Sequence, residues 1–156
     1  MKALMTGALG AAILLASVTS QAQMKPEDQV HYRQAGYSFM SWNMGKIKAQ
    51  VVEGSVPYNK EQVANAANAI AAIANSGMGA LYSPETTQEK MGKENTDLKA
   101  SFFENADEAR KVGSTFVAAA NQLASEAATG DQARIKAAFG EVGKACKSCH
   151  EKFRAE

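Results

Sequence analysis

Two cysteines and a histidine lie close together near the end of this 156-residue chain. Cys146 and Cys149 are three positions apart, and His150 directly follows the second cysteine. This is the C-x-x-C-H pattern of covalent haem attachment. On a helix the two thiols lie one turn apart on one face, so both can form thioethers to the haem vinyl groups while the imidazole turns to the iron. The motif therefore predicts one covalently attached haem c with His150 as the iron ligand.

Three other kinds of site use the same residue types. A thioredoxin-like redox pair opens a helix within a βαβ unit, whereas this pair closes the last helix of an alanine-rich chain. A structural zinc site needs four ligands, and His31 is the only further histidine or cysteine in the sequence. A structural disulfide is compatible with an oxidising compartment, but it gives the adjacent histidine no role. Haem attachment is the interpretation that uses all three residues of the motif.

The first 22 residues have the composition of a secretory signal peptide. Lys2 is followed by an apolar run through Ala16 and then by small residues up to Ala22, where cleavage would leave Gln23 as the first mature residue. The apolar run is shorter than the roughly 20 residues that a membrane-spanning helix needs, which argues against a membrane anchor. Because covalent haem attachment takes place outside the bacterial cytoplasm, we expect a periplasmic protein.

The remaining chain, residues 23–156, fits one domain with one hydrophobic core. It contains no Gly/Ser linker and no internal repeat. Removal of Lys2 with the signal peptide takes the formal net charge from +1 to zero. A neutral chain has no basic excess for nucleic acid or for a membrane surface, so neither is expected as a partner.

Four helical segments and one long loop make up this domain, and no stretch shows strand-like alternation. Each predicted helix has start and stop signals of the usual kinds. Four helices with mainly short joints predict an all-α fold, an antiparallel four-helix bundle with the haem between the fourth helix and the first. The expected ranges are 26–53, 59–77 with Asn59 as its cap, 101–130 with a Ser101/Glu104 capping box, 131 onward with Asp131 as its cap, and 83–99 for the loop across one end of the bundle.

The first predicted helix is apolar on two faces. One stripe repeats at alternating spacings of three and four residues and should face the bundle core. Tyr32, Phe39 and Trp42 fall on nearly the opposite face, and a helix that is apolar on two faces has to bury both. The inward stripe consists of Val30, Arg33, Tyr37, Met40, Met44, Ile47 and Val51.

Arg33 is the anomaly on this stripe, because a guanidinium in a core is costly to desolvate unless a counter-charge meets it. The two propionates of a haem would supply that charge. The alternative is a long side chain that snorkels from the stripe to solvent. Gln34, its neighbour, could add a neutral hydrogen bond to a propionate or could be solvated.

Two residues of the stripe could face the iron opposite His150. Tyr37 lies one turn beyond Arg33, and Met40 lies a further turn along. A methionine sulfur on the iron would give a low-spin electron carrier, whereas a neutral phenol would only cover the site. Core packing is the commoner role for Met40 and Met44. Periodicity alone leaves these alternatives open.

At several of these positions the chain resembles one known family. The run RQAGY at 33–37, the following turns through Met40, Trp42 and Met44, and the terminal CKSCHEKFR at 146–154 are similar to cytochrome c prime. The resemblance covers residues 26–154, and the C-terminal motif combined with an Arg-Gln pair on the first helix is more specific than the motif alone. It implies a high-spin, five-coordinate haem with an empty distal position, a homodimer, and binding of nitric oxide and carbon monoxide.

The resemblance also implies roles for single residues. Tyr37 stands where low-spin relatives have a methionine ligand, which favours five-coordinate iron. In the variable 83–99 loop, Asp97 is a candidate haem contact. The other implied roles are thioether attachment for Cys146 and Cys149, axial ligation for His150, propionate-side contacts for Arg33 and Gln34, and, for Arg154, the basic residue beside the proximal histidine.

Together these features predict a haem protein that binds nitric oxide and carbon monoxide, with nitric oxide scavenging or transport as its role. The alternative is an electron carrier with Met40 on the iron. Peroxidase-like catalysis is not expected, because His31 points off the inward stripe and leaves no distal histidine as acid and base. A homodimer through the first helix and the alanine-rich face of the second would bury the outer aromatic side chains. The sequence identifies no redox partner.

Overall fold

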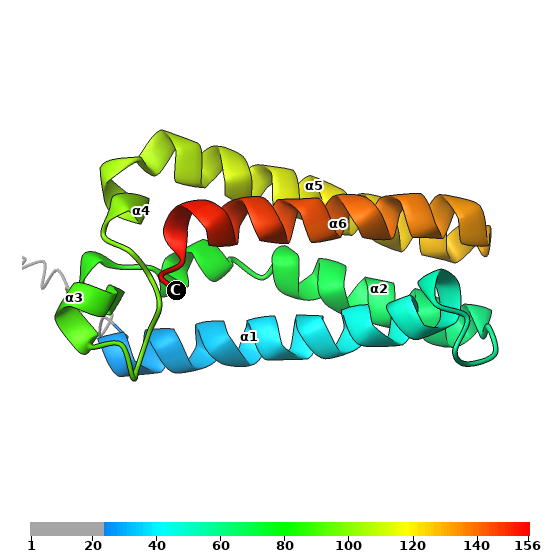
Figure 1. The fold of residues 1–156 in the computed structure, drawn as a ribbon, viewed down its shortest axis with the longest axis horizontal. Coiled ribbons are helices and arrows are strands. Elements are labelled where there is room, and N and C mark those ends of the chain that lie inside the picture. The colour runs from blue at the N-terminus through cyan, green and yellow to red at the C-terminus, as the bar shows by residue number, and fades with distance from the viewer. Residues whose placement is uncertain (1–23) are drawn as a thin grey trace, which may run out of the picture.

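The structure is a computed structural model that describes residues 24–156. Its four long helices form an antiparallel bundle in which successive long helices run in opposite directions (Figure 1). This confirms the expected all-α four-helix fold, whereas the predicted signal peptide lies outside the described residues. The long helices are α1 (Pro26–Ile47), α2 (Lys60–Ala74), α5 (Ala106–Thr129) and α6 (Gln132–Phe153).

Short helical segments join the long helices. Two of them, α3 and α4, lie with the C-terminus at the end of the bundle where α1 begins and α6 finishes, which we call the motif end (Figure 1). The loop expected at 83–99 crosses this end, as predicted, and it contains the short helices η3 and α3. Within residues 24–156 no helix is both long and apolar enough to cross a membrane. The short segments are η1 (Lys48–Val52), η2 (Met78–Leu81), η3 (Pro84–Thr86), α3 (Gln88–Met91) and α4 (Ser101–Glu104).

The long helices pack in the order α1, α2, α5 and α6, and the ring closes where α6 packs on η1. Each helix contributes a fully buried aliphatic side chain to the core: Ile47, Ile70, Leu123 and Ile135. Over the rest of its length α6 has little direct contact with α1. At the motif end the facing sides of α1 and α6 are therefore not packed against each other.

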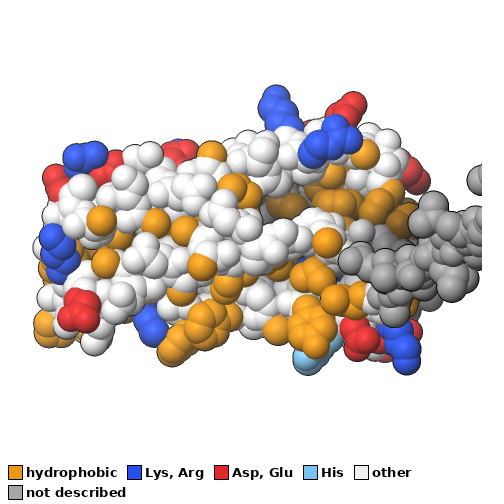
Figure 2. All heavy atoms as spheres, turned by 180° about the vertical axis from the view of Figure 1, so that it is seen from behind, with side chains coloured by type: hydrophobic (Ala, Val, Ile, Leu, Met, Phe, Trp, Pro, Cys, Tyr) orange, Lys and Arg blue, Asp and Glu red, His pale blue; other side chains and the backbone are white. Residues whose placement is uncertain are grey.

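The two apolar faces of α1 differ in how far they are buried. On the inward stripe Val30, Arg33 and Met40 are 4–5% exposed. The outer aromatic residues Tyr32, Phe39 and Trp42 remain at least half exposed. Hydrophobic side chains accordingly project from the edge of the molecule along which α1 runs (Figure 2).

The helix α1 ends earlier than predicted. The α-helix stops at Ile47, and the next five residues continue as the π-helix η1. Gln50 is buried in this segment, where its side chain accepts a hydrogen bond from Asn59 N (2.8 Å) and donates one to Gln62 Oε1 (3.2 Å). The wider turn thus ties the end of the first helix to the start of the second.

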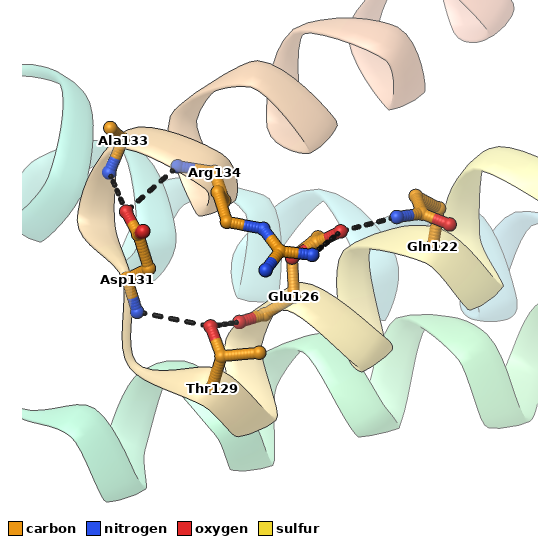
Figure 3. A network of polar contacts seen from close by, with 6 residues as sticks. All are labelled: Gln122, Glu126, Thr129, Asp131, Ala133 and Arg134. Carbon is orange, nitrogen blue, oxygen red and sulfur yellow. Dashed lines mark hydrogen bonds and ion pairs between the residues drawn. The ribbon is translucent and has the colours of Figure 1, made fainter.

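The predicted caps at the starts of α2 and α6 are confirmed. Asn59 Oδ1 accepts a hydrogen bond from Gln62 N (3.0 Å), and Asp131 Oδ1 accepts two from backbone N–H groups in the first turn of α6 (2.9 and 3.2 Å; Figure 3). Gly130 caps the end of α5 at a φ of +82°, and Gly77, in the turn after α2, has a φ of +83°; glycine adopts these values without the Cβ clash of other residues.

The predicted Ser101/Glu104 capping box is wrong, and the third helix is interrupted. Residues 101–104 form the separate turn α4, and Asn105, at φ −114° and ψ 49°, divides it from α5. The Asn105 side-chain amide donates a hydrogen bond to the Ser101 carbonyl (2.9 Å), so a local side-chain contact competes with the helical pattern. Ser101 Oγ is buried without a partner rather than capping a helix.

At the end of the bundle opposite the motif end, a buried charge joins α5 to α6. Glu126 is 6% exposed, and Arg134 Nη2 donates to its Oε1 at 2.9 Å while Nε lies 2.6 Å from Oε2 as an ion-pair contact (Figure 3). The amide of Gln122 also donates to Oε1. The Thr129 hydroxyl donates to the Glu126 carbonyl (2.7 Å) and accepts from Asp131 N (3.1 Å). The last turn of α5 is thus fixed to the first turn of α6.

Replacing Arg134 with alanine should lower the free energy of unfolding by about 1–3 kcal/mol, because it leaves the Glu126 carboxylate buried without its charged partner. Denaturant unfolding of the haem-loaded protein, followed by circular dichroism, measures the loss. Arg110→Ala is the matched control, since the Arg110–Asp107 pair is exposed and should contribute less than about 1 kcal/mol. Equal losses in the two variants would contradict the role given to the buried carboxylate.

Candidate haem-binding site

The last helix presents the two thiols of the motif. Cys146 and Cys149 lie one turn apart on α6, and both are half-buried free thiols. Burial raises the pKa of both thiols, and the charge of a Cys146 thiolate would raise the pKa of Cys149 further. Both side chains are therefore neutral thiols at neutral pH, positioned on one side of the helix.

His150 follows in the last turn of α6. Partial burial of its ring lowers the pKa of the imidazole, and the positive charge of Arg154 lowers it further. The backbone N–H of Arg154 donates to the His150 carbonyl at 3.0 Å, which keeps the two residues together at the helix end. The imidazole is therefore neutral at neutral pH, and a neutral imidazole is the form that binds a metal.

Tyr37 approaches the same space from α1. Its pKa is raised first by burial of the phenol and also by the nearby thiol positions of Cys149 and Cys146. The residue is nevertheless 40% exposed, unlike its neighbours on the inward stripe. The helices α1 and α6 therefore turn a neutral phenol and two neutral thiols toward each other at the motif end.

Tyr82, which the sequence analysis did not single out, lies beside Tyr37 at the same site. It follows η2, and its hydroxyl lies 2.7 Å from the hydroxyl of Tyr37. Burial raises the pKa of Tyr82 well above its ordinary value, so this phenol is also neutral. The Phe102 ring stacks on Tyr82 with centroids 4.6 Å apart and also contacts Phe153 edge-on. The only sequence signal for Tyr82 is an isolated aromatic residue at the edge of a polar loop.

Arg33 is buried, 5% exposed, and it does not snorkel to solvent. Its Nη1 donates to the Leu81 carbonyl (2.8 Å) and to Thr86 Oγ1 (3.1 Å), and its Nη2 donates to Thr96 Oγ1 (3.1 Å). The guanidinium also lies over the Tyr82 ring, 4.6 Å from its centroid. Within residues 24–156 no carboxylate pairs with it, so neutral oxygen atoms of the loop meet the charge, and burial lowers the pKa of Arg33.

The remaining predicted site residues lie around this centre. Gln34 is exposed and donates from Nε2 to the Asn95 carbonyl (2.9 Å). Arg154 pairs with Asp97 through Nε and Nη2, at 3.1 and 3.0 Å from Oδ2. Asp97, the candidate contact from the loop, thus fastens the loop to the C-terminal residues.

These residues fit a c-type haem. Two neutral thiols one helical turn apart suit thioether bonds, a neutral imidazole beside them suits axial ligation, and aromatic rings suit a flat apolar ligand. A buried cation without a carboxylate partner suits an anionic group of that ligand. The zinc alternative lacks ligands, because residues 24–156 contain no group of three or more His, Cys, Asp or Glu side chains that could hold a metal.

Comparison with known proteins agrees with this donor set. The family model described as cytochrome c′ matches residues 28–154. The chain belongs to the cytochrome c′ family. This family places the chain among c-type haem proteins, as the motif predicted.

Three relatives are similar over most of their length. The cytochrome c′ of Allochromatium vinosum is 56% identical over 145 residues, 93% of this chain and 92% of the relative. A solved cytochrome c′ described as having an unusual ligand-controlled dimer dissociation is 56% identical, with a TM-score of 0.80 over 86% of this chain and 100% of its own. The nitric oxide complex of a mutant cytochrome c′ from Alcaligenes xylosoxidans is 28% identical, with a TM-score of 0.74 over 85% of this chain and 98% of its own.

Replacing Arg33 with alanine should loosen the 83–99 loop, because the variant loses the guanidinium's hydrogen bonds to Thr86 and Thr96 in the loop and to Leu81 just before it. Trypsin should then cut at the exposed Lys90 and Lys93 about 5- to 100-fold faster, since removing about 1–3 kcal/mol of local stability multiplies the open population by that order. Limited proteolysis of the haem-loaded protein with mass spectrometry measures both sites. Arg110→Ala, which changes only an exposed pair, should be cut at the wild-type rate. Slow cleavage in both variants would refute the role of Arg33.

Proposed function

We propose that this protein is a periplasmic haem protein whose five-coordinate, high-spin iron binds nitric oxide and carbon monoxide, and that it scavenges or transports nitric oxide. The observation that carries the proposal is the position of Tyr37, which faces the thiol pair from α1. Its phenol is neutral, because burial raises the pKa of Tyr37. A neutral phenol covers an iron face without binding it, which leaves the position opposite His150 for a gas.

In this proposal each side chain has a role toward one haem c. Cys146 and Cys149 form the thioethers, and the neutral His150 imidazole is the axial ligand. The haem, when bound, supplies the iron that takes up a diatomic gas. Arg154 stays beside His150, where its charge favours the neutral imidazole.

Arg33 has N–H donors that no atom of the described chain uses, and these could bind a haem propionate. A guanidinium carries five N–H donors, and three of them are used within the described chain. The two that remain, on Nε and Nη2, suit a bidentate bond to a carboxylate. Gln34 lies next to Arg33 at the surface and would add a neutral contact on the propionate side.

The alternative function, electron transfer with Met40 on the iron, has weaker support. Met40 is 5% exposed and belongs to the hydrophobic core cluster together with Ile47 and Ile70. A side chain packed in this way already has its contacts satisfied, which favours core packing for Met40. Tyr37, by contrast, lies close enough to both thiols that they contribute to raising its pKa.

We propose ligand binding without catalytic turnover. His31 is exposed and packs edge-on against Tyr32, outside the inward stripe, so it supplies no acid and base opposite His150. The nitric oxide complex of the Alcaligenes xylosoxidans relative supports a gas ligand for this chain. The signal-peptide composition of residues 1–22 supports export to the periplasm.

The visible spectrum tests the iron coordination. The reduced wild-type protein should be high-spin and should change its spectrum on addition of carbon monoxide. Met40→Leu should leave the spectra of the reduced protein, with and without carbon monoxide, unchanged, because it removes the sulfur but keeps an apolar side chain of similar size. Met44→Leu is the matched control on the same stripe. A low-spin spectrum in both oxidation states that carbon monoxide does not alter would refute gas binding.

The mass of the protein isolated from the periplasm provides a separate check. It should correspond to a chain that begins at Gln23 and carries one covalently attached haem.

We also propose a homodimer through α1. Tyr32, Phe39 and Trp42 form an exposed aromatic surface along this helix, and Lys46 Nζ lies 3.3 Å from the centroid of the Trp42 ring (Figure 2). Burial of such side chains contributes about 25 cal/mol per Å² of apolar surface, so an isologous contact that covers this surface stabilises a dimer by several kcal/mol.

The contribution expected from the second helix needs correction. Its alanine-rich face, including Ala66 and Ala67, is buried in the core of its own bundle. The proposed contact therefore depends on the aromatic surface of α1. Because Tyr37 lies on the same helix, a ligand that displaces it would shift this surface, and the ligand-controlled dimer dissociation described for a 56% identical relative supports such coupling.

Replacing Trp42 with alanine should raise the dimer dissociation constant by at least about 100-fold, because each of the two copies loses a large buried aromatic side chain. Sedimentation measures the constant with and without carbon monoxide, which should itself raise the wild-type value. Val56→Ala is the control, because Val56 is 45% exposed but lies outside α1. A wild-type monomer would refute the dimer, whereas a constant insensitive to carbon monoxide would refute only the coupling.

A further inference from the structure

The hydroxyl of Tyr37 is tied to one other side chain. Within the described chain its hydrogen-bond partner is the hydroxyl of Tyr82, at 2.7 Å. Tyr82 comes directly after η2, so the bond joins α1 to the start of the segment that crosses the motif end. Both phenols are neutral, since burial raises the pKa of each, and the bond is therefore one between two neutral hydroxyls.

Tyr82 is held on several sides. The Phe102 ring stacks on it at an interplanar angle of 11°, and the Arg33 guanidinium lies over its ring. Phe102 in turn packs edge-on against Phe153, with centroids 5.3 Å apart, and Phe153 is 3% exposed on α6. These contacts hold the Tyr82 ring in place, so displacement of Tyr37 would break the bond between the two hydroxyls.

We propose that Tyr82 is a positioning residue that holds Tyr37 over the distal side of the haem site and so sets the affinity for diatomic gases. This inference rests on the proposed function, in which a gas takes the space that the Tyr37 phenol covers. Binding then requires loss of the Tyr37–Tyr82 hydrogen bond. A hydrogen bond of this kind changes an equilibrium constant by about two- to tenfold, so Tyr82 lowers the gas affinity by that factor.

The test is a double-mutant cycle on the reduced, haem-loaded protein. Carbon monoxide affinity is measured for the wild type, Tyr82→Phe, Tyr37→Phe and the double variant. Tyr82→Phe keeps the stacked ring and removes only the hydroxyl, so the affinity should rise about two- to tenfold. In the Tyr37→Phe background the same substitution should have no effect, because the bond is already absent.

Two further measurements separate positioning from a general loss of stability. Tyr58→Phe is the matched control: it removes a hydroxyl that bonds to the Gly130 carbonyl (3.2 Å), and it should leave the affinity unchanged. Ultraviolet resonance Raman spectra of the ligand-free protein report hydrogen bonding of tyrosine hydroxyls, and Tyr82→Phe should alter the signal of Tyr37.

The outcomes distinguish this inference from the proposed function. A wild type that binds carbon monoxide, with an unchanged or lower affinity in Tyr82→Phe, overturns the role of Tyr82 and leaves the proposed function standing. An equal rise in both backgrounds also overturns it, because the hydroxyl would then act without Tyr37. A wild type that binds no carbon monoxide overturns the proposed function and this inference together.

Discussion

The motif end depends on the buried guanidinium of Arg33. A charge in this position is costly to desolvate, and it is satisfied by oxygen atoms from three places in the segment 81–96, which crosses the motif end: Leu81, Thr86 and Thr96. Those bonds fix the path of the segment, and the path fixes Tyr82, over whose ring the guanidinium lies. One cation on α1 thereby orders a loop that has little apolar surface of its own to bury.

The two ends of the bundle are stabilised in different ways. Away from the motif, aliphatic side chains such as Ile47 and Leu123 fill the space between the helices, and the Glu126–Arg134 pair joins the last two helices. At the motif end, aromatic rings and polar bonds replace aliphatic packing, and α1 and α6 separate. Aliphatic packing thus joins the helices at one end, whereas at the motif end aromatic side chains such as Tyr82 and Phe102 lie beside the functional residues.

Local patterns predicted the four long helices and two of their caps, because each depends on residues close together in sequence. Asn59 and Asp131 cap as expected. The network around Arg33 could not be predicted, since Thr86 and Thr96 follow no periodic pattern and matter only once the loop folds back on α1. The Ser101 capping box failed for a different reason: the side chain of Asn105 bonds to the Ser101 carbonyl, and this local contact competes with the helical pattern that predicted the box.

The π-helical segment η1 has a consequence for the whole of α1. Its wider turn accommodates one more residue than an α-helical turn, and each residue of an α-helix accounts for about 100° of rotation about the axis. Gln50 anchors that turn to the second helix. Since α1 runs without interruption up to this anchored turn, Tyr37 and Trp42 lie on one continuous helix, and a rotation of α1 about its axis would move both side chains together.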